Sequence, residues 1–282
     1  MLKRILTGAG LVAVTLGFFA LRLLDYRWFY IYLALISIFS TFEMTRAMGK
    51  RLSFFQKVTV IAGQTLALGG FYFAEEFAFA ENSGIIIAFA AYVLAGLGLI
   101  TIAVFSREEV SLESLAVSML CLCYPGVLHL TLFMLNGIGQ NSLLALVLVF
   151  AVSPLADTFA FFTGIIFKGK KLCPAISPKK TISGAIGGLL GGTGGGVLVY
   201  VILNAQNAVY YHGGANPYVY FALVGFVAAF LTEIGDLAES YVKRRVGIKD
   251  MGNILPGHGG MLDRVDGMSF AAPFIWLAVS LL

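Results

Sequence analysis

The residues of this chain that could do chemistry gather in one stretch, residues 233–266. Its 34 residues contain five Lys or Arg, one His and six carboxylates, which are Glu233, Asp236, Glu239, Asp250, Asp263 and Asp266. Carboxylate oxygens suit a hard cation such as Mg²⁺, which usually binds one or two carboxylates together with substrate phosphates. Lys and Arg then neutralise the phosphate oxygens that the cation does not reach. The stretch therefore predicts Mg²⁺-dependent phosphate chemistry, and a solvated charged loop with internal ion pairs is the alternative.

Two kinds of local structure are expected within this stretch. No Gly or Pro interrupts residues 236–246, so they are expected to be helical. At ~100° per residue, Glu233, Asp236, Ser240 and Lys243 then share one stripe of the helix. Residues 256–260 (PGHGG) cannot form a regular helix, and their glycines allow a sharp turn close to a ligand. Because the acidic stripe begins inside an apolar helix, where charge is costly and usually functional, we favour a functional site over a solvated loop.

The composition places this site in a membrane protein. Of 282 residues, 59% are hydrophobic and only 12% are charged, against about 25% charged in soluble domains. Since a soluble core cannot absorb so much apolar surface, we expect an all-α polytopic integral membrane protein. Spans need about 20 residues, and nine candidates lie at roughly 5–21, 28–45, 58–74, 85–105, 115–135, 143–166, 184–203, 218–240 and 267–282.

Positive charge predicts the orientation of these spans. With the N-terminus in the cytoplasm, the inner loops carry 17 Lys or Arg and the outer loops carry two. This asymmetry follows the positive-inside rule and places the C-terminus outside. The loops 168–183 and 241–266 are then cytoplasmic. Asp157 in the sixth span and Glu233 and Asp236 in the eighth lie at similar depth, so a shared polar cavity open to the cytoplasm is expected.

Residues 168–184 (KGKKLCPAISPKKTISG) form the second basic loop. Ser177 and Pro178 are expected to end regular structure, and Thr181 is expected to cap the following helix. A helix N-terminus beside lysines is a good phosphate site, although simple positive-inside anchoring is the alternative. The glycine-crowded span that follows is expected to pack closely on other helices rather than cradle a nucleotide. Elsewhere, Pro125 is expected to kink the fifth span, and Glu43 to pair locally with Arg46.

The motifs together resemble a known family. Residues 240–245 (SYVKRR), 249–250 (KD) and 255–266 (LPGHGGMLDRVD) have the types and spacing of the signature of phosphatidate cytidylyltransferases, or CDP-diacylglycerol synthases, over 27 positions. Residues 157–161 (DTFAF) and 177–181 (SPKKT) resemble two further motifs of that family. The sequence departs from the family at Ser183, where Glu is common, which leaves the role of that position open.

The resemblance implies a function and its partners. It implies transfer of a cytidylyl group from CTP to phosphatidic acid, giving CDP-diacylglycerol and pyrophosphate, in phospholipid biosynthesis at a bacterial cytoplasmic membrane. Membrane lipids and a second copy of the chain, as a homodimer, are expected partners, and nucleic acid is not. Residues 1–142 are interpreted as a scaffold with lipid access, and residues 143–282 as the catalytic half, with its active site facing the cytoplasm.

Roles for individual residues follow from this interpretation. Mg²⁺ is the expected cofactor, a second cation is left open, and the expected metal ligands are Asp236 and Asp263 first, with Asp157 and Asp266 next. The expected catalytic residues are Asp236, Asp263, Asp266 and Lys249. Substrate binding is expected from Lys179, Lys180, Thr181, Lys243, His258, Gly259, Gly260 and Arg264.

Two other functions are considered. An ion- or proton-coupled transporter could use Asp157, Glu233 and Asp236, but the acids cluster toward the cytoplasmic side and the motifs show no inverted repeat. A CTP-dependent lipid kinase would release CDP instead of pyrophosphate, so the reaction products distinguish it.

Overall fold

The computed structural model describes residues 2–77, 80, 82–106 and 110–282. The chain divides into two units. The N-terminal unit comprises Met1–Phe133 and Asp250–Arg264, and the C-terminal unit comprises Met134–Lys249 and Val265–Leu282. The glycine-rich part of the signature therefore belongs to the N-terminal unit, although more than 100 residues of the other unit separate it in the sequence from Met1–Phe133. The functional division at residue 142 stays a prediction.

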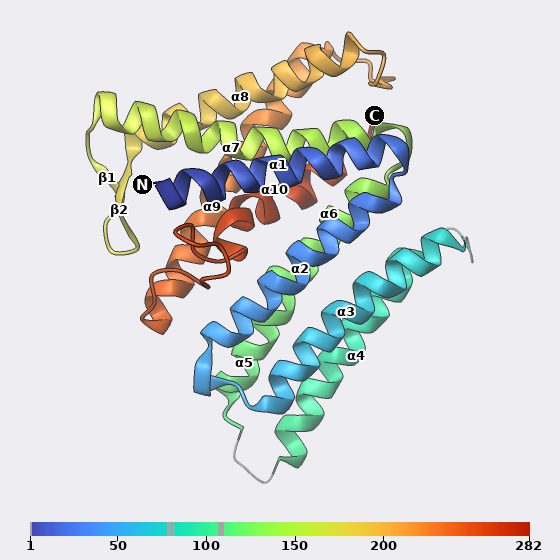
Figure 1. Cartoon of the computed structure of the whole chain (residues 1–282), viewed down its shortest axis with the longest axis vertical. Coiled ribbons are helices and arrows are strands. Elements are labelled where there is room, and N and C mark those ends of the chain that lie inside the picture. Colours follow the sequence, from blue (N-terminus) through green and yellow to red (C-terminus); the bar gives the residue numbers. More distant parts are fainter. Residues whose placement is uncertain (1, 78–79, 81, 107–109) are drawn as a thin grey trace. The chain divides into compact units, whose positions relative to one another are not determined.

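The N-terminal unit is built from antiparallel helices joined by short connections. Helices α3 and α4 run side by side (Figure 1), and α2 packs against both α1 and α3. Helix α3 begins with a capping box, in which the Ser53 hydroxyl accepts from the Gln56 amide and the Gln56 side chain accepts from the Ser53 amide. The helices are α1 (Leu2–Leu24), α2 (Arg27–Ala47), α3 (Phe54–Glu76), α4 (Ser83–Phe105), α5 (Leu112–Cys121) and α6 (Leu128–Gly137), whose last four residues belong to the C-terminal unit.

The fifth predicted span is interrupted at Pro125, as expected. A π-helical segment, Leu122–Val127, separates α5 from α6, and Tyr124 within it has non-helical dihedral angles. Proline lacks an amide hydrogen and its ring clashes with the preceding turn, so the regular hydrogen-bond ladder cannot continue through this position. The predicted kink is confirmed.

The C-terminal unit is built around the glycine-rich helix α8 (Ile182–Asn204), which packs on α7 (Ser142–Phe167) and on α9 (Pro217–Val246). Figure 1 shows α7 and α8 lying side by side. A Cβ at Gly188 would meet the Ala156 carbonyl of α7 at 3.2 Å, and one at Gly196 would meet the Gly225 amide of α9 at 3.0 Å. Because the neighbours are backbone atoms, these glycines permit the close approach of helices, and their predicted packing role is confirmed.

A short hairpin precedes α8. Strand β1 (Lys171–Cys173) pairs antiparallel with β2 (Ser177–Thr181). The expectation that Ser177 and Pro178 end regular structure was wrong, because proline is tolerated near the start of an edge strand and both strands of a two-stranded sheet are edges. The predicted cap is confirmed, since the Thr181 hydroxyl accepts from the Gly184 amide at 3.1 Å.

Within the described residues, seven helical segments are long and apolar enough to cross a membrane. They are Leu6–Leu24, Arg27–Ala47, Ser83–Phe105, Leu112–Gly137, Gly139–Phe167, Ile182–Asn204 and Pro217–Val246. The all-α polytopic membrane class is confirmed. The other two predicted spans coincide with α3 and with α10 (Leu262–Ser280), which are not among these seven. The count of nine spans and the orientation of the termini stay predictions.

Candidate functional site

Helices α9 and α10 approach each other closely where both carry acids. A Cβ at Gly235 of α9 would lie 2.7 Å from the Asp266 carbonyl oxygen and 3.0 Å from Gly267 Cα. At Gly267 of α10, a Cβ would meet the Thr232 carbonyl oxygen at 3.2 Å. A glycine on each helix therefore brings the two backbones together beside Asp236 and Asp266.

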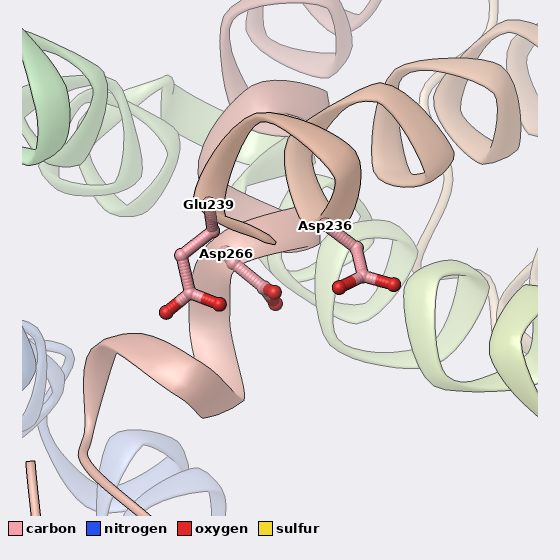
Figure 2. Close-up of side chains that lie close together, drawn as sticks. All are labelled: Asp236, Glu239 and Asp266. Carbon is pink, nitrogen blue, oxygen red and sulfur yellow. The ribbon is translucent and has the colours of Figure 1, made fainter. Parts of the chain in front are cut away.

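Three carboxylates meet at this crossing. Asp236 and Glu239 of α9 and Asp266 of α10 each offer an oxygen, and these oxygens lie within 4.8 Å of one another. Figure 2 shows the three side chains extending from the two helices to the same side. Asp236 and Glu239 share a helix face because they are three residues apart. The predicted neighbours Asp236 and Asp266 are thus brought together. Glu239 was counted among the acids but was not chosen as a site residue.

Glu239 is compensated by a lysine on its own helix. Its side chain is fully buried, and its Oε2 is paired with the ammonium group of Lys243, four residues later. Lys243 itself is only 8% exposed. Since a buried carboxylate without a partner is costly, Lys243 offsets part of the negative charge of the cluster.

Lys180 joins the hairpin to the acids of α9. From β2 its Nζ lies 2.8 Å from Glu233 Oε1 and 2.5 Å from Asp236 Oδ2. Burial by itself lowers the pKa of Lys180, but the attraction of Asp236 and Glu233 outweighs it, so the pKa lies above its ordinary value. Lys180 is therefore charged at neutral pH, and Asp236 is shared between a lysine and the acid cluster.

A cavity of about 650 Å³ opens beside this ion pair. Helices α7, α8 and α9 and the hairpin supply its lining, which includes Asp157, Lys168, Lys171, Lys179, Lys180, Thr181, Glu233 and Asp236. Asp157, Glu233 and Asp236 share this cavity, as predicted, and the predicted substrate-binding residues Lys179, Lys180 and Thr181 line it too. Its opening to the cytoplasm stays a prediction. Ser183, the position at which the family commonly has Glu, donates its hydroxyl to the Lys168 carbonyl oxygen.

The remaining predicted residues lie elsewhere in their own units. In the N-terminal unit, Gly259 (φ +86°) forms the predicted non-helical turn, and Gly260 and Met251 donate their amides to Asp263 Oδ2 at 2.7 and 2.9 Å. His258 and the exposed Arg264 belong to the same segment. In the C-terminal unit, Lys249 is exposed beyond α9. That Asp263 shares a cation with Asp236, and that His258, Arg264 and Lys249 contact substrate, stay predictions.

The helical architecture, with seven described helical segments long and apolar enough to cross a membrane, makes this an all-α polytopic membrane protein. The family model described as "Cytidylyltransferase family" matches residues 2–282, and the chain belongs to that family. The resemblance predicted from the signature is confirmed.

Named relatives agree with this assignment. The phosphatidate cytidylyltransferase of Bacillus subtilis is 30% identical over 286 residues, covering 100% of this chain and 98% of that protein. The protein of the same name from Brucella abortus is 44% identical over 156 residues, 55% of this chain and 54% of that protein. One from Rickettsia prowazekii is 34% identical over 181 residues, 64% of this chain and 76% of that protein. The match therefore spans about half the length of the Brucella relative.

Proposed function

We propose that the protein transfers the cytidylyl group of CTP to phosphatidic acid, forming CDP-diacylglycerol and pyrophosphate. Family membership and the names of the relatives support this substrate pair. The observation that carries the proposal is the position of Asp236, which belongs both to a three-carboxylate cluster and to an ion pair with Lys180. A site for a cation and a site for phosphates thus share one residue.

The acid cluster fits a hard divalent cation. Its donors are carboxylate oxygens from two different helices, which is the chemistry that Mg²⁺ prefers. Asp236, Glu239 and Asp266 would hold the cation, and Asp157 and Asp263 stay candidates from the sequence. Bound there, Mg²⁺ would supply charge stabilisation for phosphate oxygens.

The lysines would bind the nucleotide phosphates. When CTP enters the cavity, the ammonium groups of Lys179 and Lys180 would bind its phosphate oxygens, and Lys180 would exchange acid partners for them. The N-terminus of α8, capped by Thr181, would add its positive dipole end. An exchange of this kind keeps Lys180 paired both before and after binding, so neither state leaves its charge uncompensated.

The chain's residues then favour direct transfer. A phosphate oxygen of phosphatidic acid would form a bond to the α-phosphorus of CTP, and the bond from that phosphorus to the bridging oxygen of the β-phosphate would break. The lysines would stabilise the charge that develops on the departing pyrophosphate. Because the lipid phosphate is already anionic, the reaction needs no covalent enzyme intermediate. We further propose that the site faces the cytoplasm and that phosphatidic acid enters sideways from the bilayer.

The position of an isotope label tests this function. Purified protein in detergent is given phosphatidic acid, Mg²⁺ and CTP labelled with ³²P at the α or the γ phosphate. We expect the α label in the lipid and the γ label in pyrophosphate. A γ label in the lipid would indicate a kinase, and no labelled lipid from either nucleotide would leave a transporter; either result would overturn the proposal.

A further inference from the structure

Glu43 of α2 reaches a segment that is far away in the sequence. Its side chain is buried, with 2% of the residue exposed, and its Oε2 accepts the Leu262 amide at 3.0 Å. The expected local pair with Arg46 is replaced by this contact, which spans 219 positions. Leu262 is the first residue of α10, where amides lack partners within the helix. Glu43 thus caps α10 at Leu262, a residue that belongs to the same unit as α2.

The segment before α10 has space for this carboxylate. A Cβ at Gly252 or at Gly260 would collide with the carboxylate of Glu43, so a side chain at either position would exclude it. Asp263 takes up two further amides of the segment, those of Met251 and Gly260. Two buried acids therefore accept backbone amides of residues 251–262. Asp263 does so from the first turn of α10, and Glu43 does so from α2.

The start of α10 matters because of what the helix carries. Asp263 lies in its first turn and Asp266 three residues later, so both acids change direction together if the chain shifts in register along the helix. A shift of one residue in register along α10 would turn each side chain by about 100° around the helix axis. Asp266 would then no longer point toward Asp236 and Glu239.

We propose that Glu43 is a positioning residue that fixes the 251–262 segment and the first turn of α10, and thereby the direction of Asp263 and Asp266. This proposal rests on the cytidylyltransferase function proposed above. Glu43 touches no reacting group; it acts through the backbone amide of Leu262. The role explains why an acid lies at a buried position of α2, where an unneeded charge would be costly.

The test compares Glu43→Ala and Glu43→Gln with Ser37→Ala in the full-length protein. Ser37 is a matched control because it is also buried in α2 but donates to the Leu33 carbonyl within its own helix. Amide hydrogen exchange is measured by mass spectrometry alongside kcat and KM for CTP. For Glu43→Ala we expect faster exchange in residues 251–262, unchanged exchange in α8, and kcat lowered roughly ten- to a hundredfold with little change in KM.

Glu43→Gln keeps an oxygen that can accept the Leu262 amide, so we expect both effects to be intermediate; it also carries the test if Glu43→Ala does not fold. Ser37→Ala should change neither quantity. Unchanged exchange in residues 251–262, or faster exchange with full turnover, would overturn the positioning role alone. Absence of CDP-lipid with the wild-type protein would instead overturn the proposed function, and the catalytic role of Glu43 with it.

Discussion

Asp236 lies at the centre of the proposed site because it is close both to Lys180 and to the two other carboxylates of the cluster. Its Oδ2 is 2.5 Å from Lys180 Nζ, and an oxygen of its carboxylate lies within 4.8 Å of those of Glu239 and Asp266. A cation bound to the cluster and a phosphate bound to the lysine would therefore be held side by side. This is the arrangement that phosphoryl and nucleotidyl transfer require.

Lys180→Met should lower both turnover and stability. It removes a proposed phosphate partner, so we expect turnover to fall by roughly 10²-fold or more. It also leaves Glu233 and Asp236 without their cation, so the melting temperature should fall. Because the pKa of Lys180 is raised, the ion pair stabilises the fold at neutral pH and is lost only as pH rises through that pKa, above the ordinary value of 10.5.

The melting temperatures of the wild type and Lys180→Met should therefore differ at pH 7 and converge at strongly alkaline pH. Lys179→Met is the matched control for stability, because Lys179 is its exposed neighbour on β2, and it should leave the melting temperature unchanged. Equal melting temperatures for the wild type and Lys180→Met at pH 7 would contradict the structural role of the pair.

Glu239→Gln and Asp266→Asn should each raise the Mg²⁺ concentration needed for half-maximal activity. Each removes one anionic donor from the cluster, so we expect an increase of roughly tenfold or more, measured by titrating Mg²⁺ at saturating CTP. Glu113→Gln is the control, because Glu113 is an exposed acid at the start of α5 in the other unit. An unchanged Mg²⁺ requirement in both variants would remove these residues from the metal site.

The sequence identified most of these residues but not Glu239. A stripe through Glu233, Asp236 and Lys243 could be drawn from helical periodicity alone. Whether Glu239 also faces the site depends on where α10 packs, and that is decided by the close contact at Gly235. Its spacing of three from Asp236 was the available signal. This spacing could be interpreted only once the packing of α10 on α9 was known, and local sequence patterns do not show how two helices pack.

At the scale of elements, the length of the apolar segments predicted the helices well, whereas the residues typical of turns did not predict the hairpin. Each of the nine predicted spans coincides with a helix or with the kinked pair α5 and α6. The cap at Thr181 and the kink at Pro125 also follow from local chemistry. The β1–β2 hairpin was missed because its strands are short and one of them contains proline, so neither shows the alternation typical of strands.

The packing of α8 gives a prediction with an internal control. Gly196→Ala places a Cβ against the backbone of Gly225, which cannot move aside, so we expect a loss of about 1–3 kcal/mol in the free energy of unfolding. A Cβ at Gly194 meets nothing within 4 Å, so Gly194→Ala should be neutral or slightly stabilising. Denaturation of both variants in detergent measures the difference. Equal stabilities would contradict the assigned role of Gly196.

At the scale of the whole molecule, one of the two units is assembled from segments that are far apart in the sequence. The segment Asp250–Arg264 belongs to the unit formed by the first helices, and the functional division near residue 142 stays a prediction. The contacts responsible include Glu43 to Leu262 and the Thr7 hydroxyl to the Pro256 carbonyl. Backbone amides and carbonyls take part in both, and these groups leave no pattern in a sequence.

Orientation in the membrane can be tested by cysteine labelling. If the positive-inside assignment holds, Gly214→Cys should react with a membrane-impermeant maleimide in intact cells, because residues 204–217 are then outside. The native Cys173 in the hairpin should react only after the cells are permeabilised. Mass spectrometry of the labelled peptides assigns each reaction to its position. Labelling of Cys173 in intact cells, with Gly214→Cys protected, would reverse the assignment.

The most direct measurement of the central claim is the location of a bound divalent ion. Crystals of the protein grown with Mn²⁺ in place of Mg²⁺ and with CTP would give an anomalous diffraction peak at each Mn²⁺ ion. We expect a peak coordinated by carboxylate oxygens of Asp236, Glu239 and Asp266, with nucleotide phosphates beside Lys180. A peak held by none of these three acids would contradict it.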